Sequence, residues 1–203
     1  FGSFGNSTDA IPFFSRRIGL ARNTEGNLIE NRIIGGVRLS GKLSRDWRLG
    51  LLNMHTSSDA DNGIPSNNNM MLALQRTLFS RSNLGLFMLN RQSFEDYSFL
   101  DPKNEYNRVL GLDYNLATAD NTWTGKFYLH KSLQPGDNKG NLSSQATLSY
   151  NSRKYTATTD FLYIDQDFRS DLGYIPRTDV FKSRNLVGRN FYPASGRITR
   201  HGI

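Results

Sequence analysis

The chain contains no cysteine among its 203 residues. That absence excludes a disulfide framework, a thiolate zinc site and a cysteine nucleophile. No stretch approaches the run of about 18 apolar residues that a transmembrane helix requires. The net charge is +7, yet lysine and arginine are dispersed through the chain and form neither a basic arm nor a known nucleic-acid motif. We therefore expect no transmembrane helix and no nucleic-acid partner.

Proline is also scarce, and its six positions show where strands are excluded. Because proline cannot donate to a β-ladder, it is confined to edges, bulges and loops. All the prolines lie outside the segments that read as strands, which are 32–44, 47–56, 69–79, 84–93, 106–118, 122–132, 141–151 and 155–165. Short breaks between these segments alternate with long ones, and each long break holds one proline: 57–68, 94–105, 133–140 and 166–179. The pattern allows a ninth strand near 180–191, although its alternation is weak.

Hydrophobic residues make up only 37% of the chain, which is low for a packed core but suits a membrane barrel, where one face of each strand is apolar. Strands that cross a membrane need roughly 9–11 residues, whereas strands of soluble proteins centre on about 5–6. Alternating short turns and long loops are typical of outer-membrane barrels. Charged residues on the apolar faces all fall near strand ends, as lipid contact requires: Arg76, Arg108, Lys131 and Asp165.

Aromatic residues mark one end of the expected strands. Trp47, Trp123 and Tyr155 each open a strand after a short turn, and Phe79 closes a strand before one. We predict that these four form an interfacial girdle on the short-turn side. The opposite faces would line a lumen with more cations than anions, which predicts a preference for anions. The predicted lining residues are Arg32, Arg38, Lys42, Arg48, Arg91, Asp113, Lys126, His130 and Asp160.

Two of the expected strands depart from the simple alternation. In the strand that begins at Trp47, the apolar face switches side after Leu51. In the fourth strand, Phe87 and Leu89 would point inward. A bulge could re-aim either strand, or an inner plug or a partner could cover the inward apolar residues. The sequence leaves these alternatives open.

Several motifs resemble one known family. They are FFSRRIGL at 13–20, GGVRLSGK at 35–42 with WRLGLLN at 47–53, and LGYIPRTD at 172–179. These strings are similar to segments of a Bacteroidota outer-membrane protein family of uncharacterised function. The resemblance implies a large β-barrel, of which this chain would cover about the first half, preceded by a carbohydrate-binding family 9-like domain that is missing here. It implies no established catalytic residues.

Catalytic and metal-ligating constellations are sparse. The chain has three histidines, of which His130 shares a face with Asp113 of the neighbouring strand. The register favours an ion pair of Asp113 with Lys126 instead. A hydrolase would also need a serine beside His130, and the candidates are Ser132 and Ser143. No run of acids has the spacing of a calcium loop. We predict no catalytic residue, no metal site and no cofactor.

The sequence as a whole predicts an all-β protein, an antiparallel up-and-down transmembrane β-barrel of which about 8–9 strands are present. Residues 1–30 are rich in glycine, serine and asparagine and form a lead-in segment, in which the pair Arg16-Arg17 is either solvated or contacts an acidic or phosphate group. Residues 31–203 form the N-terminal part of the barrel, and because the chain starts without Met we expect a processed product or a fragment.

We expect this protein to act in the cell outer membrane as a pore, a transporter component or a surface scaffold without catalysis. Its partners would be outer-membrane lipid and either missing strands of the same chain or a larger outer-membrane protein complex. Two alternatives stay open, an outer-membrane barrel hydrolase and a soluble glycan-binding β-sandwich.

Overall fold

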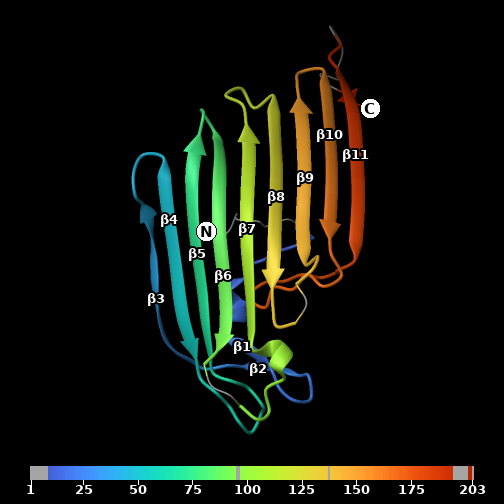
Figure 1. The fold of residues 1–203 in the computed structure, drawn as a ribbon. Helices are drawn as coiled ribbons and strands as arrows, with labels where there is room; N and C mark the ends of the chain where they lie inside the picture. The colour runs from blue at the N-terminus through green and yellow to red at the C-terminus, as the bar shows by residue number, and fades with distance from the viewer. Residues whose placement is uncertain (1–8, 95–96, 137, 194–200, 203) are drawn as a thin grey trace.

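The computed structural model describes residues 9–94, 97–136, 138–193 and 201–202. Over these residues the protein is all-β (Figure 1), and its only helical pieces are two 3-10 turns, η1 (Ser15–Arg17) and η2 (Pro102–Asn104). None of the helical pieces described is long and apolar enough to cross a membrane. The strands are β1 (Leu20–Arg22), β2 (Leu28–Glu30), β3 (Ile33–Lys42), β4 (Trp47–Thr56), β5 (Asn67–Leu78), β6 (Ser82–Ser93), β7 (Tyr106–Ala117), β8 (Trp123–Leu133), β9 (Leu142–Asn151), β10 (Tyr155–Ile164), β11 (Val180–Phe191) and β12 (His201–Gly202).

Strands β3 to β11 form one antiparallel sheet in which each strand pairs with its neighbours in the chain. Figure 1 shows them side by side in chain order. These nine strands confirm the expected all-β, up-and-down arrangement, including the weak ninth strand. The sheet is not closed over the described residues, because β3 forms one edge and β11 pairs on its far side only with the two-residue β12 among them. A closed barrel therefore stays a prediction.

Short turns join the strands at one end of the sheet, the top in Figure 1, and side chains fix their geometry. In the β7–β8 turn, Asp120 accepts hydrogen bonds from the Thr122 hydroxyl (2.6 Å), the Thr118 hydroxyl (2.7 Å) and the Thr122 amide (3.0 Å). These bonds, that of the Thr122 hydroxyl foremost, hold the pKa of Asp120 well below its usual range. Asn121 beside it has a φ of 58°, a left-handed conformation that asparagine tolerates.

One face of the sheet is covered at the long-loop end by two segments, residues 9–31 and 165–179, which we call the plug. The two segments join each other through Ile11 and Tyr174, whose amides donate to each other's carbonyls at 3.0 and 2.7 Å. The hydrophobic core lies between plug and sheet. The plug contributes Ala10, Ile18, Phe168 and Leu172, and the sheet contributes Met71, Ala73, Phe87, Leu89, Val109, Tyr128, Leu162 and Ile164. We call this covered face the inner face.

The plug explains the two strands whose alternation is irregular in the sequence. Strands β4 to β7 pair without a register shift, so no bulge re-aims β4 or β6. Instead, Leu52 and Met54 of β4 pack against the core beneath the plug, and Phe87 and Leu89 of β6 belong to that core. The inward apolar residues are therefore covered by the chain itself.

Candidate functional site

The face opposite the plug, the outer face, is mostly apolar, and its large side chains are exposed. Large side chains in the middle of four central strands are between 44% and 53% exposed: Leu86, Leu112, Leu129 and Phe161. Every sheet residue of the buried core points to the inner face instead. The middle of the sheet thus presents exposed apolar side chains on several strands, whereas soluble proteins rarely expose contiguous apolar patches beyond a few hundred Å².

Aromatic residues border this apolar surface at both ends. Trp47, Trp123 and Tyr155 begin strands at the short-turn end, and Phe79 occupies the β5–β6 turn there, so the structure brings the four predicted girdle residues to one end of the sheet. A second row, which sequence reasoning missed, lies on the outer face at the long-loop end and consists of Tyr106, Tyr163 and Phe181.

The spacing between the two aromatic rows can be estimated along β10. Its first residue, Tyr155, belongs to one row, and Tyr163, near its end, belongs to the other. Eight residues at roughly 3.3 Å each span about 26 Å along the strand. With the roughly 40° tilt of barrel strands, that span is about 20 Å along a membrane normal, close to the apolar band of outer-membrane barrels.

The inner face carries most of the predicted lining residues. The register places eight of the nine on it: Arg38, Lys42, Arg48, Arg91, Asp113, Lys126, His130 and Asp160. Arg32 lies before β3, and the register shift between Ile33 and Gly35 interrupts the alternation there, so Arg32 is not in register with Arg38. Whether the inner face lines a lumen stays a prediction.

Three of these cations form a group on the part of the inner face near the short turns. Arg38, Lys42 and Arg48 are exposed, and Lys42 and Arg48 are direct cross-strand neighbours. None of the three makes an ion pair with another residue in the described part of the chain. This group therefore keeps a concentrated positive charge.

Asp160 lies elsewhere on the inner face, and neighbouring side chains balance its negative charge. It accepts hydrogen bonds from Thr147 (2.6 Å) and Gln145 (2.7 Å) and pairs with Arg184 of β11 at 3.2 Å. Next to Arg184 on that face, Lys182 pairs with Asp9 of the plug at 3.0 Å. The sequence did not predict Arg184 and Lys182 as inner-face residues, because the weak alternation of β11 does not show which side chains share a face.

Asp113 contacts His130 in addition to interacting with Lys126, the partner that the sequence favoured. His130 Nε2 lies 3.0 Å from Asp113 Oδ1, and both side chains are fully buried. Lys126 also acts on Asp113 through its charge, so the expected Asp113–Lys126 ion pair stays a prediction. The His130 ring is also stacked on Tyr128, with 4.2 Å between ring centroids. This histidine is thus part of the plug-side core and not only a polar lining residue.

Ser143 is the cross-strand neighbour of His130, so the residue types of a hydrolase triad do come together. However, Ser143 Oγ and His130 Nδ1 both lack a hydrogen-bond partner among the described residues, so serine and histidine are not bonded to each other. Asp113, His130 and Ser143 are also completely buried. Because Asp113 and His130 are buried and no serine is bonded to His130, these residues do not form an assembled catalytic site.

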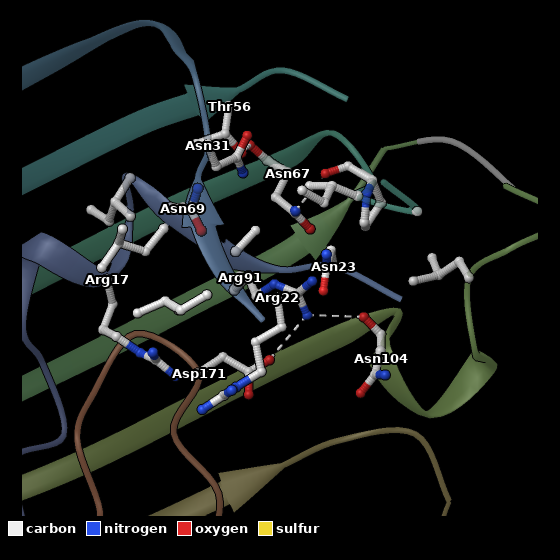
Figure 2. Close-up of a pocket in the computed structure, with 18 of the residues that line it drawn as sticks. Arg17, Arg22, Asn23, Asn31, Thr56, Asn67, Asn69, Arg91, Asn104 and Asp171 are labelled. Atoms are coloured by element: carbon white, nitrogen blue, oxygen red, sulfur yellow. Dashed lines mark hydrogen bonds and ion pairs between the residues drawn. The ribbon is translucent and has the colours of Figure 1, made fainter. Parts of the chain in front are cut away.

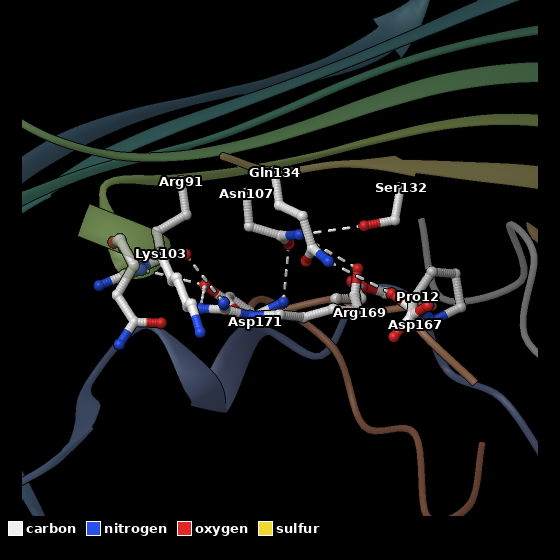
Figure 3. A network of polar contacts seen from close by, with 11 residues as sticks. Pro12, Arg91, Lys103, Asn107, Ser132, Gln134, Asp167, Arg169 and Asp171 are labelled. Atoms are coloured by element: carbon white, nitrogen blue, oxygen red, sulfur yellow. Dashed lines mark hydrogen bonds and ion pairs between the residues drawn. The ribbon is translucent and has the colours of Figure 1, made fainter. Parts of the chain in front are cut away.

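Polar contacts fasten the plug to the inner face (Figure 3). Arg169 holds Asp171 in a two-pronged ion pair (2.6 and 2.9 Å), and Arg91 of β6 reaches the same carboxylate at 3.0 Å. Asn107 of β7 donates to the Arg169 carbonyl and accepts from the Asp171 amide. Ser170 donates to the carbonyl of Pro12 at 2.6 Å. These contacts link the sheet to the 165–179 segment of the plug, and Ser170 links that segment to residues 9–31.

A cavity of about 580 Å³ lies between the plug and the inner face of β5 and β6. Figure 2 shows arginine and asparagine side chains gathered around it. Plug residues on its wall include Arg17, Arg22 and Asn31, and sheet residues include Asn67, Asn69 and Arg91. Of these, sequence reasoning singled out only Arg17 and Arg91, because the rest become neighbours only when the plug folds onto the sheet.

Across the described ranges, no three His, Asp or Glu side chains gather closely enough to hold a metal ion. Comparison of the chain with models of known protein families, with curated proteins and with solved structures finds no match. The resemblance to an outer-membrane family therefore stays a prediction.

Proposed function

We propose that this chain is the N-terminal part of an outer-membrane β-barrel that carries an internal plug and serves as a pore, a transporter component or a surface scaffold, without catalysis. The observation that carries the proposal is the sidedness of the sheet. Its mostly apolar face is exposed, whereas the face that carries most of the charged residues is the one that the plug covers. In a soluble layered protein the apolar face would be the covered one. A lipid bilayer in contact with the exposed apolar face suits this arrangement.

The dimensions of the sheet also support a membrane location. Its strands are 10 to 12 residues long, which matches the length of tilted membrane strands, roughly 9–11 residues. Aromatic rows border the apolar surface at both ends, where the interfaces would lie. Arg108, a charge on the outer face, lies near a strand end and is bonded to Asn90 and Gln92.

The two alternatives have weaker support. A β-sandwich needs a second sheet on the apolar face, whereas the small β1–β2 sheet belongs to the plug on the inner face. A hydrolase needs an accessible nucleophile, whereas the Asp113–His130 pair and Ser143 are buried beneath the plug.

The open edges of the sheet suggest the partner. An unpaired strand edge is a template for further strands, and β3 exposes one along its whole length. We infer that further strands, from the same polypeptide or another subunit, pair with β3 and β11 to close the barrel.

Adjacent residues of β9 provide the test. Leu148 points to the outer face and Ser149 to the inner face. In the complete barrel, Leu148→Arg should prevent assembly into lipid vesicles, because a lipid-facing arginine near mid-membrane costs about 2–4 kcal/mol. Ser149→Arg, which keeps its charge in the interior, should assemble. Protease protection after mixing with vesicles measures both, and equal assembly of the two variants would contradict the membrane proposal.

A further inference from the structure

The cavity between plug and sheet has more positive charge than its own residues neutralise. Four arginines line it, Arg17, Arg22, Arg91 and Arg169, against two aspartates, Asp101 and Asp171. Asp171 is shared by Arg91 and Arg169, and Asp101 is engaged in capping η2 through the Lys103 amide at 2.9 Å. The surplus of two positive charges comes from the plug.

Two of the three plug arginines in this lining, Arg17 and Arg22, retain free donors. Arg22 uses one guanidinium nitrogen to donate to the Gly26 carbonyl at 2.7 Å. Arg17 makes no side-chain hydrogen bond or ion pair with any residue that the structure describes, and a guanidinium offers five N–H donors in a planar fork. Figure 2 shows Arg17, Arg22 and Arg91 on the side of the cavity where Asp171 lies. Such forks match the two oxygens of a carboxylate or the oxygens of a phosphate.

Opposite these charges, the wall offers neutral polar groups. Asn31, Asn67 and Asn69 are 9%, 5% and 4% exposed, and all three line the cavity. The Asn67 Oδ1 atom is buried without a hydrogen-bond partner in the described part of the chain. The carboxamides of Asn31 and Asn69 likewise make no hydrogen bond with any described residue. Buried amides are normally satisfied, so this wall has free donors and acceptors that suit hydroxyl groups.

The size and the remaining wall of the cavity exclude a bare inorganic ion as its natural occupant. A volume of about 580 Å³ falls in the range of small-molecule sites. Apolar side chains complete the lining, among them Ile18, Leu20, Ile64 and Leu172. They would contact a carbon skeleton, which an inorganic anion lacks.

We propose that this cavity binds a small hydroxylated carboxylate of the size of a sugar acid. The carboxylate binds Arg17 and Arg22 of the plug, and the hydroxyl groups bind Asn67 and Asn69 of β5. The ligand therefore bridges plug and sheet and holds the β1–β2 hairpin in place. The proposal is independent of the membrane assignment, because every contact lies within this chain.

Calorimetric titration of the folded full chain tests the proposal with D-glucuronate, D-galacturonate and D-gluconate as probes. D-Glucose serves as the neutral comparison and inorganic phosphate as the anion without a hydroxylated skeleton. At least one sugar acid should bind, and glucose and phosphate should bind at least tenfold more weakly. Bound sugar acid should also slow amide exchange in Leu20–Arg22 and Leu28–Glu30.

Matched variants locate the site. Arg17→Gln and Asn69→Ala should each weaken sugar-acid binding, Arg17→Gln by about tenfold or more, as expected when a charged hydrogen bond is lost. Their neighbours are the controls: Arg16 is exposed and does not line the cavity, and Asn68 points to the outer face, where it bonds Asn53. Arg16→Gln and Asn68→Ala should leave binding unchanged.

Three results would overturn the proposal. They are no binding of any sugar acid, equal binding of glucose, or binding of phosphate and sugar acids alike with no effect of Asn69→Ala. None of these results would bear on the membrane proposal, which the β9 variants test separately.

Discussion

Gly111 shows how a single residue sets the packing of the inner face. It lies on β7 directly across from Phe87 of β6, and a Cβ atom at this position would lie 2.2 Å from Cε1 of the Phe87 ring. That ring is buried and meets the edge of His130 with 5.1 Å between centroids. Phe87 therefore occupies the volume that the glycine leaves, and it has little room to move.

Gly111→Ala should destabilise the fold by about 1–3 kcal/mol, because it overpacks a filled core. Gly41 of β3 is the matched control, since a Cβ there meets nothing within 4 Å, and Gly41→Ala should be neutral or slightly stabilising. Urea unfolding of the three proteins measures the difference. Adding Phe87→Leu to Gly111→Ala should recover part of the loss, and equal effects of the two alanines would contradict the packing argument.

The surroundings of Asp113 show what strand alternation leaves open at the scale of residues. The alternation correctly places Asp113, Lys126 and His130 on one face. The register pairs Asp113 with Tyr128, so Lys126 and His130 are both diagonal neighbours, and strand pairing cannot choose between them. Burial under the plug brings His130 into hydrogen-bond contact, and the strands carry no signal of that burial.

At the scale of elements, the strands were predictable and the plug was not. Period-two alternation, proline-free segments and regular breaks define β3 to β10, because each strand signals itself locally. The plug is held by isolated contacts between distant residues, such as Asn107 with the Arg169 carbonyl. Only the irregular alternation of β4 and β6, with inward apolar residues such as Leu52, Phe87 and Leu89, indicated that something covers this face.

Asn107→Ala should loosen the 165–179 segment of the plug while leaving the sheet intact. Its side chain bonds Ser132, the Arg169 carbonyl and the Asp171 amide, so its loss removes contacts worth about 1 kcal/mol each. Amide exchange should accelerate at residues 168–174 and remain slow in β7 to β9. Asn115→Ala is the control on the same strand and face, because the Asn115 side chain bonds no described residue other than Asn83 of the neighbouring strand. Faster exchange of the plug in both variants would contradict the role given to Asn107.

At the scale of the whole molecule, the charge of the inner face determines which ions it attracts. The exposed group Arg38, Lys42 and Arg48 lies on the part of the face near the short turns. Charges on a confined wall focus potential more strongly than the same charges on an open surface. The complete barrel, if it conducts, would therefore favour anions.

Planar-bilayer reversal potentials in a salt gradient measure this preference. The wild-type pore should prefer anions, with a preference that fades at high salt as screening shortens the range of the field. Arg38→Glu with Lys42→Glu should shift selectivity toward cations. Arg45→Glu with Arg81→Glu makes the same charge change in the short turns and should have a smaller effect. Cation preference in the wild-type pore would contradict this charge argument.

The contact between Ser170 and Pro12 joins residues 158 positions apart, and this separation affects the order in which the protein assembles. Local hairpins such as β7–β8 close short loops at small entropic cost, whereas long-range closure is slow. Residues 9–31 can pack against the sheet only after β5 to β10 have paired and the 165–179 segment has formed. The N-terminal segment is therefore expected to dock among the last, and until then the inner apolar residues stay uncovered and prone to aggregation. A folding catalyst or chaperone that shields this surface would act at that stage.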